Sequence, residues 1–260
     1  IAADGLQDEF RRLFADRPVL AWASEQGATR PEALGAVQLF SHVAINNRWE
    51  LPLYRHWLPG ARLLYLPFGC ARWYAEALLP RKDWATDFVA DGGCHYVCGE
   101  HGGWKRASVD IMVRPLFDQR LTLWGHGPAD HGWLGVPGAE PFYRGAYHPN
   151  EHGQIYSSCA VYVGISWNWA LGGYGAKLAR ALGAGACVLW HRTVGMELDG
   201  LVPGLHLMTS GTPEETRHAA LWLLKADDHR RKIAAAGQAF ALREWEWGSN
   251  LKRLIGELNG

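Results

Sequence analysis

Three glycines and a lysine make up the part of this sequence best suited to binding chemistry. Gly172, Gly173 and Gly175 follow a β-branched run at 161–166 and precede a helical stretch that contains Lys177. Glycines let a ligand come close to the backbone, and the first amides of a helix suit phosphate. The segment therefore predicts a site for a ligand that bears a diphosphate. The alternative is an ordinary tight turn, because such turns occur in most α/β proteins.

The positions of these residues depend on alternating strands and helices along the whole chain. Short apolar and β-branched runs predict strands at 18–24, 42–47, 61–67, 95–99, 121–125, 142–147, 161–166, 187–191 and 205–208. Helical spacing predicts helices at 5–14, 49–58, 72–80, 107–117, 150–159, 174–183, 213–225, 227–245 and 249–258. This alternation is typical of parallel βαβ units and predicts an α/β fold. The polar, glycine-terminated stretch 81–93 is expected to separate two domains.

The segment GGYGAKLARALGAG at 172–185 resembles the donor-site segment of retaining GT-B glycosyltransferases. In that family a Glu-Gly-Phe-Gly turn leads into a helix ending Glu-Ala-x-Ala-x-Gly. Gly172 and Arg180 stand where the family has its two glutamates. A similar subgroup is the spore-maturation-protein-like glycosyltransferases, which often have a basic residue at the place of Lys177. The resemblance covers residues 84–258 well, and the earlier part of the chain only by the order of its elements.

The resemblance implies an α/β fold of the GT-B type, with two Rossmann-like domains built on parallel sheets. Residues 1–83 would form an incomplete acceptor-side domain, and residues 84–240 the domain that binds a nucleotide sugar. Residues 241–260 would form closing helices that pack back toward the first domain. The implied reaction moves a sugar from a nucleoside-diphosphate sugar, with a UDP-sugar as the first expectation. The acceptor could be a glycan, a small molecule or a modified nucleic acid. No bound metal and no tightly bound cofactor are expected.

The resemblance and the positions of residues at strand ends together assign donor-binding residues, which are Gly99, Lys105, Arg106, His126, Ser166, Asn168, Gly172, Gly173, Tyr174, Gly175, Lys177 and Glu197. In this assignment Lys105 or Arg106 neutralises the departing diphosphate, because fixed cations stabilise charge that develops on a leaving group. Glu197 and Asp199 are the acids nearest to the expected donor site and could replace the missing ribose carboxylate. Glu25 is a candidate for the base that activates the acceptor, and an ordinary loop acid is the alternative.

Other residues allow both a binding and a structural interpretation. Trp167 and Trp169 flank Asn168 and could stack on a sugar or a base, although packing accounts for most tryptophans among the fourteen in the chain. His126 either contacts the donor or is a solvated turn residue. The cysteines and histidine at 94–98 offer three zinc ligands with no second ligand pair, so no metal site is expected there.

Charge and cysteine content exclude several classes of protein. Lys and Arg together number 26, and so do Asp and Glu, which argues against a protein dedicated to nucleic-acid phosphates. Five scattered cysteines fit reduced thiols in a cytoplasmic protein, and the sequence shows no signal-peptide pattern and no membrane-length apolar run. Two alternatives stay open: a GT-B enzyme that glycosylates a macromolecule such as modified DNA bases, and a non-catalytic module that binds a nucleotide or a sugar.

Overall fold

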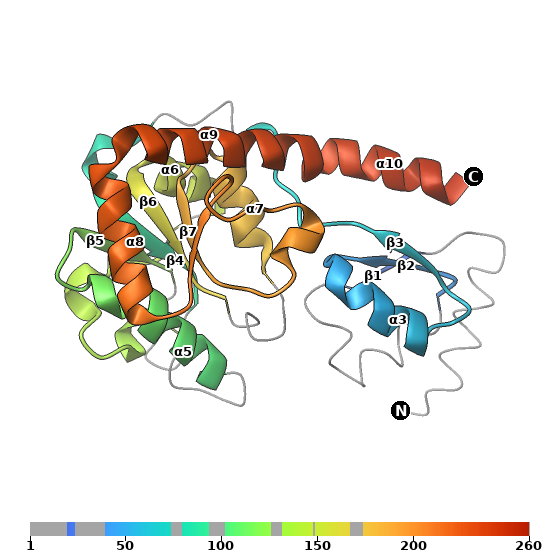
Figure 1. Ribbon diagram of the computed structural model, residues 1–260, viewed down its shortest axis with the longest axis horizontal. Coiled ribbons are helices and arrows are strands. Elements are labelled where there is room, and N and C mark those ends of the chain that lie inside the picture. Colours follow the sequence, from blue (N-terminus) through green and yellow to red (C-terminus); the bar gives the residue numbers. More distant parts are fainter. Residues whose placement is uncertain are drawn as a thin grey trace. The chain divides into compact units, whose positions relative to one another are not determined.

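The chain divides into two units, each built on a parallel sheet. The computed structural model describes residues 20–23, 40–73, 80–93, 102–125, 132–147, 149–166 and 174–259. Unit 1 contains Ile1–Phe68 and Gly248–Gly260, and unit 2 contains Gly69–Trp247. Figure 1 shows both units and labels most of their α-helices and strands. Two parallel sheets with intervening helices confirm the α/β fold predicted from the sequence.

Unit 1 holds a three-stranded parallel sheet in the order β1-β2-β3. Its elements are β1 (Leu20–Ala23), β2 (His42–Ile45), the 3-10 helix η2 (Arg48–Glu50), α3 (Leu51–Trp57), β3 (Arg62–Tyr65) and all but the first residue of α10 (Trp247–Asn259). Val43 and Ile45 of β2 are buried and pack against Tyr54 of α3. Arg253 of α10 donates a hydrogen bond to the backbone oxygen of Tyr65 at 3.4 Å. The C-terminal helix therefore contributes to the unit that contains the first strands.

Unit 2 contains a five-stranded parallel sheet in the order β5-β4-β6-β7-β8. The strands are β4 (Thr86–Asp91), β5 (Leu121–Trp124), β6 (Cys159–Gly164), β7 (Val188–His191) and β8 (Met208–Ser210). The helices are α5 (Gly102–Met112), α6 (His152–Ser157), α7 (Ala176–Gly183), α8 (Pro213–Lys225) and α9 (Asp227–Glu244). Short 3-10 helices are η3 (Lys82–Trp84), η4 (Arg114–Leu116), η5 (Trp133–Gly135), η6 (Glu140–Phe142), η7 (Pro149–Glu151) and η9 (Met196–Asp199). The strand order reverses at β4, which makes the β4–β6 boundary a topological switch point of the kind where open parallel sheets bind ligands.

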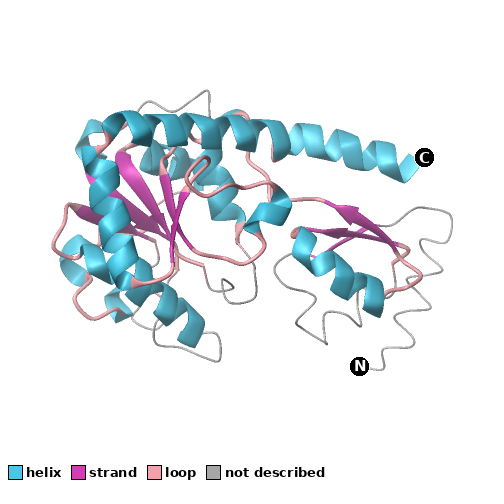
Figure 2. Cartoon of the chain, in the orientation of Figure 1, coloured by secondary structure: helices cyan, strands magenta, loops and turns pink. Residues whose placement is uncertain are grey.

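Helices cover both faces of the unit 2 sheet, which Figure 2 shows as strands between helical layers. α5 and α8 lie on one face, and α6 and α7 lie on the other, with α9 packed along α7. Alternate residues of β6 reach the two layers. Val161 and Val163 join the core beneath α5 and α8, whereas the Tyr162 ring packs against Tyr156 of α6 with ring centroids 4.8 Å apart. All four residues of β5 and of β7 are buried, as expected for parallel strands covered on both faces.

The main correction to the sequence prediction concerns residues 81–93. The sequence predicts no strand in this polar stretch, but it contains β4, the strand at which the sheet order reverses. Phe88, Val89 and Ala90 are fully or almost fully buried. The strand is missing from the prediction because aspartates on both sides of this short apolar run make it look polar. The strand predicted at 95–99 lies outside the described residues.

Two further strand predictions are corrected. Residues 142–147 form no strand, because only Tyr143 makes a single parallel bridge, to Leu123. The strand predicted at 205–208 begins only at the last of these residues, since a turn with Gly204 at φ +83° comes before it. Within the described residues, the sheet of unit 2 has five strands, of which β4 was not predicted from the sequence.

The helix predictions agree better with the structure. α8 has the predicted bounds, and Thr212 caps it by accepting a hydrogen bond from the Glu215 amide at 3.2 Å. α7 ends as predicted and is followed by Gly185, whose φ of +76° is the left-handed conformation that stops a helix. Two predicted helices lie wholly or mostly outside the described residues, at 5–14 and 72–80.

Candidate functional site

The candidate site lies at the carboxyl ends of β4 and β6, at the switch point. β4 ends at Asp91 and β6 ends at Gly164, and the two strands pair in parallel. The helix that follows each strand begins at this edge of the sheet, α5 at Gly102 and α7 at Ala176. Both helices therefore direct the positive end of their dipole to the same edge. This arrangement favours an anionic ligand.

The first turn of α7 can accept an anion. Its cap residue is Gly175, which has extended backbone angles (φ −90°, ψ 175°) and no side chain that could accept a hydrogen bond. The first turn contains no acidic residue. The Leu178 amide donates to the Gly175 oxygen at 3.1 Å, but among the described residues no side chain caps this helix. Uncapped amides and the helix dipole together suit a phosphate group, which is the chemistry expected from the sequence.

Lys177 fixes a positive charge at the end of β4. Its Nζ atom donates a hydrogen bond to the backbone oxygen of Asp91 at 2.8 Å. Gly92 allows this contact, because a Cβ atom at that position would lie 2.4 Å from Nζ, and its φ of +99° also favours glycine. An ammonium group has three donors, and within the described residues the other two on Lys177 have no hydrogen-bond partner. The group is therefore both positioned and able to bind a second acceptor.

A buried carboxylate holds the end of β4 in place. The Asp91 side chain is fully buried and accepts hydrogen bonds from the hydroxyls of Tyr147 (2.8 Å), Tyr156 (3.3 Å) and Tyr162 (2.5 Å). His152 Nε2 lies 3.8 Å from the same carboxylate. Burial and then the Asp91 charge raise the pKa of Tyr162 well above its usual value, so this hydroxyl keeps its proton. The Asp91 carboxylate therefore accepts hydrogen bonds from tyrosines of the protein itself. The backbone oxygen of Asp91 is the atom that contacts Lys177 at the candidate site.

A second buried network connects β6 and β7 to α5. The Ser166 amide donates to the Ser108 hydroxyl at 3.1 Å, and that hydroxyl lies 2.9 Å from His191 Nδ1. All three residues are buried. Burial lowers the pKa of His191 to about 4, so the imidazole is neutral at pH 7. Ser166, which the sequence assigned to the donor, therefore lies at the expected edge with its amide bonded to α5.

The two adjacent basic residues of the sequence prediction lie inside α5. The sequence places the start of this helix at residue 107, but it begins at Gly102, so Lys105 and Arg106 belong to its first turns. Lys105 is only 7% exposed, whereas Arg106 is exposed. Both follow β4 in the chain and lie at the amino end of α5, at the carboxyl edge of the sheet.

Two residues predicted to contact the donor contact other parts of the protein. Tyr174 is buried, its hydroxyl donates to Asp199 Oδ2 at 2.6 Å, and its ring stacks on Trp245 with centroids 5.5 Å apart. The Asp199 carboxylate therefore accepts a hydrogen bond from the protein itself. Glu197 lies on the same 3-10 helix, η9, and is exposed.

The remaining predicted site residues lie outside the described residues, and they are Glu25, Gly99, His126, Asn168, Gly172 and Gly173. The same holds for the tryptophans at 167 and 169 and for the cysteine and histidine cluster at 94–98. The described residues contain no group of three or more His, Cys, Asp or Glu side chains arranged to hold a metal ion. None of the described helices has the length and apolar character needed to cross a membrane.

Comparison with known families identifies the chain. A family described as glycosyl transferase-like has a sequence model that matches residues 106–256, more than half of the chain. The chain belongs to this family. The match covers α7, most of α5 and the last four strands of unit 2. No curated protein matches the sequence significantly.

The structure of this glycosyl transferase-like protein is similar to several solved structures. The Anabaena protein Alr3699/HepE in complex with UDP-glucose has a TM-score of 0.66 and 15% identity, over 97% of this chain and 75% of that one. Sucrose-phosphate synthase from Thermosynechococcus elongatus has a TM-score of 0.68 and 14% identity, over 98% and 70%. An α,α-trehalose-phosphate synthase (UDP-forming) from Burkholderia xenovorans, in complex with glucose-6-phosphate, has a TM-score of 0.63 and 12% identity, over 98% and 71%. The two parallel sheets match GT-B glycosyltransferase structures, which confirms the predicted fold class.

Proposed function

We propose that this protein transfers a sugar from a nucleoside-diphosphate sugar to an acceptor, with the diphosphate bound at the first turn of α7. The observation that carries the proposal is the position of Lys177, whose ammonium group is held by the Asp91 oxygen at 2.8 Å. A fixed cation and an uncapped helix N-terminus at the edge of the switch point suit two negatively charged phosphates. Membership of a glycosyl transferase-like family supports the reaction class.

The proposed donor is a UDP-sugar. Alr3699/HepE was solved with UDP-glucose, and the Burkholderia synthase is described as UDP-forming. The proposed ribose contact is Glu197, because it is exposed in the loop after β7, whereas Asp199 accepts the Tyr174 hydroxyl. The proposed acceptor is a glycan, a small molecule or a modified nucleic acid.

The proposed reaction needs no bound metal. When the bond between the sugar and the diphosphate breaks, negative charge develops on the departing phosphate oxygen. Lys177 and the first amides of α7 would stabilise that charge, and Lys105 or Arg106 of α5 would assist. Preorganised donors of this kind contribute about 3 kcal/mol each to transition-state stabilisation in other enzymes. The buried Asp91 network would contribute by keeping the end of β4, and with it Lys177, in a fixed place.

One observation favours a second candidate function, a module that binds a nucleotide sugar without transferring it. Arg180 lies in α7 where the family resemblance expects a ribose-binding glutamate. A cation cannot accept hydrogen bonds from ribose hydroxyls as a carboxylate does. Binding would then depend on the phosphate contacts alone, and the sugar could be held without the orientation that transfer requires.

Titration with nucleotides tests both candidates. Thermal-shift and calorimetric titrations would use the diphosphates of uridine, guanosine, thymidine and adenosine, together with their common sugars. We expect saturable binding of UDP and of a UDP-sugar, followed by slow release of UDP from the UDP-sugar without an acceptor. Binding without any release would identify the non-catalytic module. If a folded sample binds none of these nucleotides, the diphosphate site is contradicted.

A further inference from the structure

A second concave site lies beside α8 and the edge strand β8. It is a cavity of about 450 Å³, lined among others by Arg192, Met208, Glu215, His218, Ala219 and Trp222. This volume lies within the range of ordinary small-molecule pockets. β6 and β7 separate β8 from β4, so the cavity is three strand spacings, or roughly 14 Å, from the end of β4. It is therefore distinct from the proposed diphosphate site.

One wall of the cavity is apolar and centred on an exposed tryptophan. Trp222 is 38% exposed, which is unusual for so large an apolar side chain. His218 and Glu215 precede it at four and seven residues along α8, so the three side chains share one face of the helix. Met208 and Ala219 are partly buried and pack against the core below. The wall therefore offers an aromatic surface that is held by a well-packed helix.

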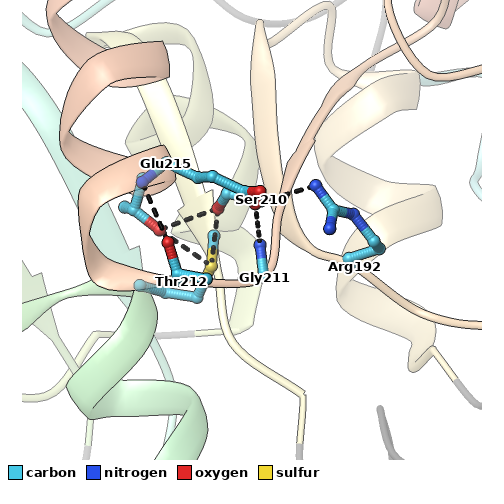
Figure 3. Close-up of polar contacts among 7 residues, drawn as sticks. Arg192, Ser210, Gly211, Thr212 and Glu215 are labelled. Carbon is cyan, nitrogen blue, oxygen red and sulfur yellow. Dashed lines mark hydrogen bonds and ion pairs between the residues drawn. The ribbon is translucent and has the colours of Figure 1, made fainter.

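The cavity is also lined by a charged pair, Arg192 and Glu215, whose polar contacts are shown in Figure 3. Arg192 Nη2 donates to Glu215 Oε2 at 2.8 Å, and the Gly211 amide donates to the same oxygen, also at 2.8 Å. Thr212 caps the turn that carries Glu215. The Gly211 amide and the Arg192 charge lower the pKa of Glu215, so the carboxylate stays ionised at neutral pH. The pair is therefore oriented before any ligand binds.

The pair still has unused hydrogen-bonding capacity. Within the described part of the chain, Glu215 Oε1 accepts no hydrogen bond, and Arg192 Nε and Nη1 donate none. The two opposite charges cancel, so the cavity favours neither an anion nor a cation. It presents an acceptor and donors beside an aromatic face. A sugar ring matches this combination, because its hydroxyls both donate and accept while one of its faces is apolar.

We propose that this cavity binds a neutral sugar residue of an oligosaccharide, with the ring on Trp222 and two hydroxyls on the Arg192–Glu215 pair. The site would hold a glycan chain next to the proposed transferase site. Binding of the sugar residue in this cavity does not depend on which nucleotide the donor carries. Its chemistry distinguishes it from the α7 turn, which suits a phosphate.

Calorimetric titration with neutral oligosaccharides tests the proposal. The probes are oligomers of glucose, galactose, mannose and N-acetylglucosamine, selected from a glycan array and titrated against the full chain. We expect at least one to bind saturably, Trp222→Ala to weaken that binding at least tenfold, and Trp222→Phe to keep most of it. Arg192→Ala should weaken it about fivefold. UDP binding should stay unchanged in all three variants, which separates this site from the donor site.

Trp73→Ala is the matched control, because Trp73 is 45% exposed and does not line the cavity. It should bind the oligosaccharide like the unmodified protein. The proposal is overturned if no oligosaccharide on the array binds, or if Trp222→Ala and Trp73→Ala change the affinity equally. Circular dichroism of each variant confirms that its fold is intact.

Discussion

Gly92→Ala should weaken donor binding through its effect on Lys177. The new Cβ atom would lie 2.4 Å from Nζ of Lys177. Because Nζ is the far end of a flexible side chain, it can move away at little cost in stability. Moving it breaks the 2.8 Å hydrogen bond to the Asp91 oxygen and removes the cation from the end of β4. The substitution therefore tests the position of the charge without removing the charge.

Two magnitudes follow from the geometry. An alanine at φ +99° costs about 1–3 kcal/mol of folding stability, because L-residues rarely adopt this conformation. Gly204→Ala should cost a similar amount, since Gly204 has φ +83° and its Cβ atom would meet nothing within 4 Å. Only Gly92→Ala should also raise the Kd for UDP, by about tenfold, which corresponds to about 1.4 kcal/mol.

Calorimetry with UDP and urea unfolding measure the two effects separately. In a protein that already carries Lys177→Ala, Gly92→Ala should lower stability as before but leave the Kd for UDP unchanged, because the two changes act through one group. The reasoning is refuted if Gly92→Ala folds and binds UDP as tightly as the unmodified protein. It is equally refuted if the two substitutions weaken binding additively.

Three further predictions concern stability. Gly164→Ala should cost about 3 kcal/mol or prevent folding, because its Cβ atom would lie 1.8 Å from the buried ring of Trp190; an unchanged urea midpoint would contradict this. Thr212→Ala should cost about 1 kcal/mol through loss of the cap to the Glu215 amide, whereas Thr212→Ser should cost little in the same unfolding assay. His191 is neutral in the folded state with a pKa of about 4 but titrates near 6.5 when unfolded, so protonation favours unfolding as the pH falls through this range. Stability should drop by about 2 kcal/mol more between pH 7.5 and pH 5 than it does in a folded His191→Gln variant.

Local patterns in the sequence were sufficient to predict most of the framework. The helix from 213 to 225 could be delimited because a threonine cap and a proline mark its start. The strand at 188–191 could be found because it is a short apolar run between a glycine turn and a loop. β4 was missed, since its central position depends on pairing with two strands more than thirty residues away, which no local pattern encodes.

Only the part of the candidate site that is formed by residues close together in the sequence was predictable. Lys177 and the α7 turn could be proposed because glycine, lysine and helix follow one another in the chain. Asp91 could not be proposed, because its role depends on contacts between residues far apart in the sequence. Its carboxylate accepts hydrogen bonds from tyrosine hydroxyls, and its backbone oxygen accepts one from Lys177. Tyr174 and Asp199 could not be paired for the same reason, as 25 residues separate them.

The position of Lys177 at the diphosphate is the central claim, and calorimetric titration of UDP into two lysine variants tests it most directly. Lys177→Ala should raise the Kd for UDP at least tenfold, which corresponds to about 1.4 kcal/mol. Lys232→Ala, which removes an exposed lysine of α9, should leave the Kd unchanged. Equal affinity of the unmodified protein and a folded Lys177→Ala variant would contradict the account and remove this residue from the site.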